Sequence, residues 1–405
     1  MEHKAEIVMD PRGGANQSRV RDHNERLVLS LVRRHENLSK AEIAKRSGLS
    51  AQTISVIMRA LEGDGLLLRG EPQRGKVGQP SIPMRLDPEG VFSIGLKIGR
   101  RSADMVLIDF LGSELQSKSI TFDYPTPKVL FEFADIGIRD LIEGLPVEHR
   151  SRIAGVGIAM PFELWNWAEK IGASESEMAD WRAFNFQAEL AAATGLPVFV
   201  QNDATSACGA ELVFGRGTEL SDFVYFFVGT FIGGGIVLNN NLFVGPTGNA
   251  GAFGAFPTTQ EDGSVSTLID EASVYTLETR MREAGIDDSP LWTNPDDWHS
   301  LGKLLDEWIA TTAHHLARAA VGSCAMIDFQ AAVVDGAFPD DIRERLVAEI
   351  QLEVDKLDTR GIAHPIILEG QVGRGARALG GAGLPLFARY LLDQNVLFKE
   401  TGGIT

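Results

Sequence analysis

Cysteines and long apolar runs are scarce in this chain of 405 residues. Only two cysteines occur, Cys208 and Cys324, which excludes a disulfide framework and a thiolate-rich zinc site. The first residues are polar and lack the apolar core of a signal peptide. The longest apolar stretch, 223–238, is shorter than the roughly 20 residues of a membrane-spanning helix and is broken by glycines. We therefore expect a soluble, cytoplasmic protein with no membrane partner.

The chain also lacks an overall positive charge. It has 38 lysines and arginines against 55 acidic residues, a net charge of −17, which on average repels a polyanion such as DNA. The charge is unevenly distributed, because residues 1–86 carry a net +5 and the remainder carries −22. This asymmetry predicts a small basic module, typical of nucleic-acid binding, joined to a large acidic one. A basic solvated face with no partner is the alternative that charge leaves open.

Helical periodicity in the basic module begins near Asn24, after a segment, 1–20, that we expect to be a mobile tail. Apolar residues recur at i and i+4 between 27 and 32. Ser39 and Glu42 have the spacing of a capping box and open a short helix that ends near Gly48. Ser50 then caps a third helix, whose expected inward residues are Ile54, Ile57, Met58 and Leu61. Two helices joined by a short glycine-containing turn predict a helix-turn-helix, and we assign it to residues 21–88.

The outward side of the third helix carries short polar groups and one arginine, which suit base edges and phosphates in a major groove. Segments 66–69 and 82–86 are expected to be two short strands around a flexible tip, which together form a wing. Basic residues lie between glycines at that tip, an arrangement that suits a narrow minor groove. The predicted DNA contacts are Ser50, Gln52, Thr53, Ser55, Arg59, Arg74 and Lys76. A small helical adaptor that binds protein is the alternative.

The large module alternates strand-like and helix-like runs, which predicts an α/β fold. Two hairpins are expected, at 91–98 with 104–110 and at 223–228 with 233–238. Further strands are expected at 153–160, 198–201, 332–336 and 365–370. Asn202 and Asp203 follow the strand at 198–201, at the kind of strand end where α/β proteins place ligands.

A winged helix followed by this α/β order resembles the ROK family of repressors, open reading frames and kinases, over about residues 20–405. The motifs that carry the resemblance are 157–161 (GIAMP), 200–204 (VQNDA) and 228–238 (VGTFIGGGIVL). The stretch 160–167 looks like the form found in bacterial regulators of sugar uptake. The resemblance implies a two-lobed actin-like, ribonuclease H-like ATPase fold over 89–405, a sugar cleft between the lobes, and dimers or tetramers. Lobe one is expected at about 89–200 plus the C-terminal helix, and lobe two at about 201–380.

Sugar kinases of this family carry an Asp in a phosphate-binding hairpin, an Asp base, and a zinc site of one His and three Cys. Lys97 stands at the hairpin Asp and is followed by two arginines at 100 and 101, so Mg·ATP is not expected, although binding of some other anion stays open. Asp203 keeps the position of the base. Ala255 stands where the zinc-binding His would be, and Ala252 replaces a sugar-contacting Glu. We therefore expect no catalysis, no cofactor and no metal.

The resemblance carries sugar contacts over only to Asn202 and Asp203. Glu163, Trp165 and Asn166 follow the turn at 161 and are further effector candidates, because indoles pack on sugar rings and carboxylates and amides bond hydroxyls. Burial of Trp165 and Trp167 in a core or an interface is the alternative. The adjacent pair His314 and His315 lies in a helical run and is expected to be structural, because neighbours on a helix do not share a face. Glycines at 373, 375, 380, 381 and 383 resemble a family helix junction in which close packing is expected.

These observations predict a sugar-responsive, DNA-binding transcriptional regulator. We expect a repressor of sugar uptake or catabolism genes that is relieved by a sugar or sugar phosphate in the cleft. A homodimer or homotetramer would bind a roughly palindromic operator. Two alternatives stay open: an ATP-dependent sugar kinase with a fused DNA-binding domain, and a protein-binding scaffold with an inactive cleft.

Overall fold

The computed structural model describes residues 17–35, 37–72, 82–162, 178–260, 262–293 and 298–392. These residues divide into two compact units, with boundaries between Leu86 and Asp87 and between Arg389 and Tyr390. The smaller unit includes residues 390–392, because the backbone N–H of Leu392 donates a hydrogen bond to Ser30 Oγ at 2.8 Å. Among the helices of the described residues, none has the length and apolar character needed to cross a lipid bilayer.

The smaller unit is a winged helix-turn-helix, as predicted. Its elements are α1 (Gln17–His35), β1 (Leu38–Ser39), α2 (Lys40–Ser47), α3 (Ala51–Gly63), β2 (Leu67–Arg69) and β3 (Pro83–Leu86). Within the described residues the strands form one antiparallel sheet in the order β1-β3-β2. The β1 strand was not predicted, and α1 already includes residues 17–20, which the sequence placed in the tail. The wing tip, 73–81, lies outside the described residues.

The capping box of the helix-turn-helix is confirmed. Ser39 Oγ accepts from the N–H of Glu42 at 3.3 Å, and Glu42 Oε2 accepts from the N–H of Ser39 at 2.8 Å. Gly48 follows α2 with φ of 71°, a left-handed conformation that glycine adopts without strain. Because these signals are local, the sequence was sufficient to locate both helices. The predicted inward residues of α3 are all buried: Ile54, Ile57, Met58 and Leu61.

The first lobe of the larger unit is built on a five-stranded sheet in the order β6-β5-β4-β7-β8, within the described residues. Its strands are β4 (Phe92–Ile98), β5 (Ser102–Ile108), β6 (Glu114–Thr121), β7 (Ile153–Ala159) and β8 (Val198–Gln201). Strands β4, β5 and β6 are antiparallel neighbours, whereas β7 and β8 run parallel to β4. The lobe also contains η1 (Pro88–Gly90), α4 (Pro127–Glu143), η2 (Val147–Arg152), η4 (Asp180–Arg182) and α7 (Phe186–Thr194).

The second lobe repeats this strand order. Its five-stranded sheet among the described residues has the order β11-β10-β9-β14-β15, again with three antiparallel strands followed by two parallel ones. The strands are β9 (Phe223–Val228), β10 (Gly233–Leu238), β11 (Asn241–Phe243), β14 (Ala331–Gly336) and β15 (Ile367–Glu369). A small hairpin of β12 (Pro257–Thr259) and β13 (Val265–Thr267) lies apart from this sheet. The two lobes are therefore two copies of one topology, as expected of an actin-like fold.

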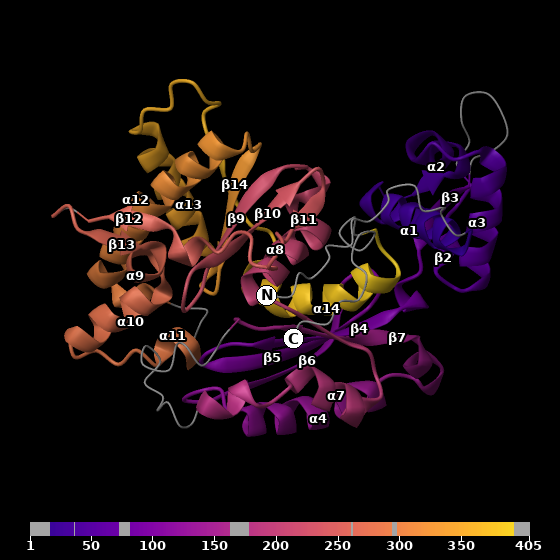
Figure 1. Ribbon diagram of the computed structural model, residues 1–405, viewed down its shortest axis with the longest axis horizontal. Helices are drawn as coiled ribbons and strands as arrows, with labels where there is room; N and C mark the ends of the chain where they lie inside the picture. The colour runs from indigo at the N-terminus through magenta and orange to yellow at the C-terminus, as the bar shows by residue number, and fades with distance from the viewer. Residues whose placement is uncertain are drawn as a thin grey trace, which may run out of the picture. The chain divides into compact units, whose positions relative to one another are not determined.

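Helices cover both faces of each sheet (Figure 1). The helices and turns that follow β8 along the chain are α8 (Asp203–Phe214), η5 (Arg216–Thr218), η6 (Phe253–Ala255), α9 (Leu268–Ala272), α10 (Val274–Glu283), α11 (Pro290–Thr293), η7 (His299–Leu301), α12 (Lys303–Met326), α13 (Asp340–Asp355), η8 (Gly373–Gly375) and α14 (Ala376–Arg389). The last of them, α14, packs against the first sheet and α8. Strand β9 is covered on both faces, since Phe226 packs in the core with α12 and α13 while Phe227 packs in the core with α8. Its residues are therefore apolar on both sides.

Glycines allow α14 to approach both the first sheet and α8 more closely than side chains would permit. A Cβ on Gly157 of β7 would lie 1.8 Å from the backbone oxygen of Gly381, and one on Gly95 of β4 would lie 2.1 Å from that of Ala378. On the opposite side of α14, a Cβ on Gly380 would lie 1.9 Å from the backbone oxygen of Ser206. The predicted close packing is therefore found at Gly380 and Gly381. It is not found at Gly375, where an added Cβ meets nothing within 4 Å.

This packing predicts that Gly380→Ala destabilises the larger unit by at least about 2 kcal/mol, because the clash is with backbone that cannot rotate away. Gly375→Ala is the matched control, since it adds the same methyl group in open space and should change stability by less than about 1 kcal/mol. Calorimetric unfolding of both variants checks the prediction. Equal melting temperatures for the two would contradict it.

Candidate functional site

The exposed side of α3 is the candidate DNA-reading surface. Gln52, Ser55 and Arg59 lie on one face of the helix, opposite its buried residues. Ser55 Oγ donates to the backbone oxygen of Ala51 at 2.9 Å, and Arg59 Nε donates to the backbone oxygen of Ser55 at 3.2 Å. The structure adds Val56 to this face, with 56% of its surface exposed. Its spacing of four residues from Gln52 was the signal that sequence reasoning overlooked.

Two of the predicted DNA contacts also have a structural role at the start of α3. Ser50 Oγ accepts from the N–H of Thr53 at 3.1 Å and lies 2.8 Å from the Thr53 hydroxyl oxygen. Such an N-cap satisfies a backbone donor that the first turn of a helix otherwise leaves unpaired. The predicted wing contacts Arg74 and Lys76 lie outside the described residues.

In the larger unit, the predicted effector residues Asn202 and Asp203 sit at the junction of β8 and α8. Asn202 Oδ1 accepts from the N–H groups of Ala204 and Thr205 at 3.0 and 3.2 Å, so it caps α8. Asp203 Oδ2 accepts from Arg377 Nη1 at 3.3 Å, and both side chains are nearly buried. The carboxylate that the resemblance places as the kinase base is thus held in an ion pair with α14.

Lys97 is a structural residue of the β4–β5 hairpin. Its ammonium group is buried and donates to the backbone oxygen of Ser102 at 3.2 Å, to Ser102 Oγ at 2.7 Å and to Asp104 Oδ2 at 2.9 Å. Burial and the nearby charge of Arg377 lower its pKa to about 8, against the opposing effects of Asp104 and Asp203. A Cβ on Gly99 would lie 2.7 Å from Lys97 Nζ and 3.0 Å from the backbone oxygen of Ser102, so glycine leaves room for the lysine to fold across this turn.

Arg100 connects the β4–β5 turn to the β9–β10 turn of the other lobe. Its guanidinium carbon lies 4.1 Å from the ring centroid of Phe231, which is a cation–π contact. Burial lowers the Arg100 pKa to about 10, with a further lowering from Arg377 and an opposing effect of Asp203. Phe231 in turn packs edge-on against Tyr275 of α10, with ring centroids 5.5 Å apart. The arginine therefore occupies the space between the two hairpin turns.

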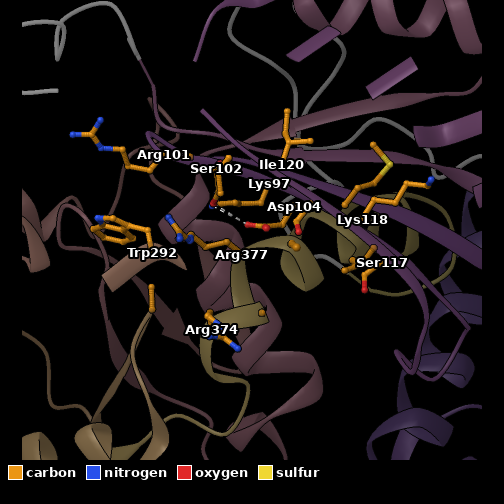
Figure 2. Close-up of a pocket in the computed structure, with 18 of the residues that line it drawn as sticks. Lys97, Arg101, Ser102, Asp104, Ser117, Lys118, Ile120, Trp292, Arg374 and Arg377 are labelled. Carbon is orange, nitrogen blue, oxygen red and sulfur yellow. Dashed lines mark hydrogen bonds and ion pairs between the residues drawn. The ribbon is translucent and has the colours of Figure 1, made fainter. Parts of the chain in front are cut away.

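A cavity of about 470 Å³ opens beside these residues (Figure 2). Its lining comes from the β4–β5 hairpin, β6, the β9–β10 turn, α11, η8 and the start of α14. Among the described residues, six basic ones line it, Lys97, Arg100, Arg101, Lys118, Arg374 and Arg377, against two acidic ones, Asp104 and Glu114. Sequence reasoning had identified Lys97, Arg100 and Arg101 but missed Arg374 and Arg377, because only the fold brings the C-terminal segment to this position.

Two buried carboxylates hold the segment that carries Arg374. Glu211 of α8 accepts from the N–H groups of Gln371 and Val372 at 3.1 to 3.3 Å. Asp335, at the end of β14, accepts from the N–H of Gly373 at 2.9 Å and from the Tyr225 hydroxyl at 3.1 Å. Burial raises the pKa of both carboxyls, against the opposing effect of these hydrogen bonds. The approach from β15 to α14 is thus fixed by side chains of the second lobe.

The residues present do not fit a magnesium nucleotide or a zinc ion. A magnesium–phosphate site needs oxygen ligands, whereas the hairpin here offers Lys97, Arg100 and Arg101, and Asp203 is paired with Arg377. The segment around Ala252 and Ala255 contains no His or Cys. In the part of the chain that is described, no three His, Cys, Asp or Glu side chains gather closely enough to hold a metal ion.

The remaining candidates separate into two groups. Glu163, Trp165, Asn166 and Trp167 lie outside the described residues. The histidine pair on α12 contacts two different partners, as a structural role predicts: His314 Nδ1 lies 3.2 Å from Glu353 Oε2, and His315 Nε2 lies 3.6 Å from Glu271 Oε2.

The Lys97–Asp104 pair predicts a pH-dependent stability. Replacement of Asp104 by Asn leaves a buried ammonium without its countercharge and should cost about 1–3 kcal/mol at pH 6. Because the folded-state pKa of Lys97, about 8, lies below its ordinary value of 10.5, the unfolded chain binds more protons between these pH values, and stability from this group rises with pH. The loss of folding stability caused by Asp104→Asn should therefore be smaller above pH 8, where Lys97 is neutral in the folded protein.

Urea unfolding of the larger unit at pH 6 and pH 9 measures this effect. Asp140→Asn is the control, since it breaks the exposed Lys118–Asp140 pair and should cost less than about 1 kcal/mol at either pH. A deficit for Asp104→Asn that stays constant between the two pH values would show that Lys97 does not titrate as described.

Comparisons with known proteins agree with this architecture. Residues 93–267 match the ROK family model, and residues 21–67 match the model of winged helix-turn-helix DNA-binding domains. An uncharacterized protein of Sinorhizobium fredii, y4fQ, is 25% identical over 91% of both chains. The xylose repressor of Bacillus spizizenii is 24% identical over 240 residues, which cover 59% of this chain and 62% of the repressor.

Among solved structures, a ROK family transcriptional regulator described as a homolog of the Escherichia coli MLC protein has the same fold. The match has a TM-score of 0.65 with 18% identity and covers 92% of this chain and 97% of that one. Residues 93–267 therefore match the ROK family, residues 21–67 form a winged helix-turn-helix DNA-binding domain, and the chain has the fold of a solved ROK family transcriptional regulator.

Proposed function

We propose that the protein is a sugar-responsive transcriptional regulator, which represses genes of sugar uptake or catabolism and is relieved by a sugar or sugar phosphate. The observation that carries the proposal is the pairing of a DNA-binding domain with a kinase-like cleft whose base position, Asp203, is ion-paired to Arg377. A carboxylate held in this way suits binding of a sugar hydroxyl better than removal of its proton. The similarity to a xylose repressor supports repression as the regulatory role.

The DNA side of the proposal rests on α3. Its exposed Gln52, Ser55 and Arg59 match the kinds of side chain that read base edges, and Val56 suits contact with a thymine methyl group. A helix-turn-helix protein commonly reads two half-sites as a dimer, so we propose a homodimer or homotetramer on a roughly palindromic operator. Relief requires that the effector bind the DNA-competent and DNA-free states with different affinities.

The rival function is an ATP-dependent sugar kinase fused to the DNA-binding domain, and retention of Asp203 is the observation in its favour. Against it stand Lys97, whose ammonium is fully engaged with Ser102 and Asp104, and Arg100, which fills the space between the hairpin turns. A coupled ATPase assay with a panel of sugars decides between them. Turnover that disappears in Asp203→Asn would establish the kinase.

We predict that Arg59→Ala weakens operator binding by about 1–3 kcal/mol, as expected when a guanidinium that reads a base is lost. The operator is first selected with the full chain from a pool of random duplexes, and affinity is measured by gel shift.

Val56→Ala should relax the preference of the protein at one base pair of the operator, with little loss of overall affinity. Loss of Arg74 or Lys76 should reduce the dependence of affinity on salt.

The control for Arg59→Ala is Arg139→Ala on α4, which removes an exposed arginine and the same unit of charge. Its operator affinity should equal that of the unmodified chain. If Arg59→Ala also binds the operator as tightly as the unmodified chain, the prediction that α3 reads DNA is contradicted.

We also predict that a cognate effector raises the melting temperature of the larger unit and releases the operator. Ligand at 100 times its Kd stabilises a folded protein by about 2.7 kcal/mol, so a panel of sugars and sugar phosphates is screened by thermal shift. Asp203→Ala should abolish the shift, whereas Asp135→Asn on the outer helix α4, which breaks its pair with Arg139 outside the cavity, should preserve it. A complete absence of shifts across the panel would favour the scaffold alternative.

A further inference from the structure

The cavity in the larger unit has a strongly basic end. Figure 2 shows Arg101, Arg374, Arg377 and Trp292 at one end and Ser117 and Lys118 at the other. Lys118 is paired with Asp140 of α4 at 2.7 Å. The three arginines come from the β4–β5 turn, η8 and α14, so distant segments of the sequence supply like charge to one place. This accumulation occurs in a module with a net charge of −22, in which chance would favour the opposite sign.

The basic groups act on one another electrostatically. The positive charge of Arg377 lowers the pKa of both Lys97 and Arg100, in addition to the effect of burial. Like charges in a partly buried site raise the free energy of the folded protein, and a bound anion removes that cost. Asp203 offsets part of it, because its carboxylate raises the pKa of the same two groups. A bound anion would therefore relieve the repulsion among Lys97, Arg100 and Arg377.

The backbone contributes to the same end of the cavity. Gly375, Arg377 and Ala378 line it, and they belong to the first turn of the 14-residue helix α14 and the residue before it. The amide groups at such a helix start carry partial positive charge and favour anions. No side chain blocks this approach at Gly375, where an added Cβ would meet nothing within 4 Å.

Guanidinium groups and helix amides together fit a phosphate group. Arginine presents paired N–H donors that match two phosphate oxygens. A magnesium ion would be repelled by the same arginines, so binding needs no divalent cation. The cavity volume of about 470 Å³ is in the ordinary range for small-molecule sites and exceeds what a phosphate alone occupies. Leu291 and Trp292 offer apolar surface to the rest of the ligand, and Arg377 links the site to Asp203.

We propose that the cleft binds a small organic phosphate, whose phosphate is held by Arg374 and Arg377 at the start of α14 without a divalent cation. The inference rests on the proposed function in one respect, that this cleft is the effector site. It deepens that function, because it assigns an anionic effector whose phosphate lies beside Arg377, the residue that pairs with Asp203.

The test is isothermal titration of the full chain with inorganic pyrophosphate in buffer containing EDTA. We expect binding of one pyrophosphate per chain, weakened about tenfold or more by Arg374→Ala, because one charge-assisted hydrogen bond contributes about that much. Arg374→Lys should recover only part of the loss, since it restores charge but not paired donors. Arg360→Ala is the matched control, because it removes an exposed arginine outside the cavity and should leave binding unchanged.

A panel of phosphorylated sugars then competes against pyrophosphate. At least one phosphorylated sugar should bind tenfold or more tightly than its unphosphorylated form. The proposal is overturned if no phosphorylated compound binds in EDTA, if binding appears only with Mg²⁺, or if Arg374→Ala binds as tightly as the unmodified chain. Neutral sugars that shift the melting temperature without any phosphate binding would overturn this inference alone. Arginine-dependent phosphate binding with no effect on operator affinity would instead overturn the proposed regulatory function.

Discussion

The close backbone approach of α14 is the constraint on which the larger unit depends. Gly95 and Gly157 on the first sheet and Gly380 on the helix itself leave no room for a side chain between α14, the sheet and α8. Because α8 also packs against the second sheet, α14 and α8 form the layer that joins the two lobes (Figure 1). The cleft exists where this layer begins, since Asp203 opens α8 and Arg377 lies in the first turn of α14.

The position of the site therefore follows from how the ends of these two helices are anchored. Asn202 caps α8, while Glu211 and Asp335 accept the backbone donors of the segment that leads into α14. Buried carboxylates are costly unless they are fully hydrogen-bonded, and here each satisfies several donors. Glu211 and Asp335 contact the backbone of this segment, whereas Arg374 and Arg377 line the cavity. The larger unit therefore has a basic cavity although its own net charge is negative.

Two basic side chains beside the cavity are also structural parts of the fold. Lys97 stabilises a hairpin turn through Ser102 and Asp104, and Arg100 spans the two lobes through its contact with Phe231. Both side chains therefore stabilise the fold and also add positive charge to the lining of the cavity.

The sequence by itself determined the elements whose signals are local. The capping box at Ser39 and Glu42, the apolar face of α3, the wing strands and the glycine-turned hairpin of β9 and β10 all depend on neighbours within a few residues, and all are confirmed. Charge counting along the chain also separated a basic module from an acidic one. The β1 strand escaped prediction because two residues carry no periodicity.

Only the tertiary structure decided what surrounds Asp203. The residue was a candidate from its motif, but its ion pair with Arg377 joins positions 174 apart in the chain. The twin strand order of the lobes and the gathering of Arg101, Arg374 and Arg377 around one cavity are likewise products of long-range packing. No local pattern encodes such contacts, because they depend on where α14 lies against the first sheet, and glycines at 95, 157 and 380 set that placement.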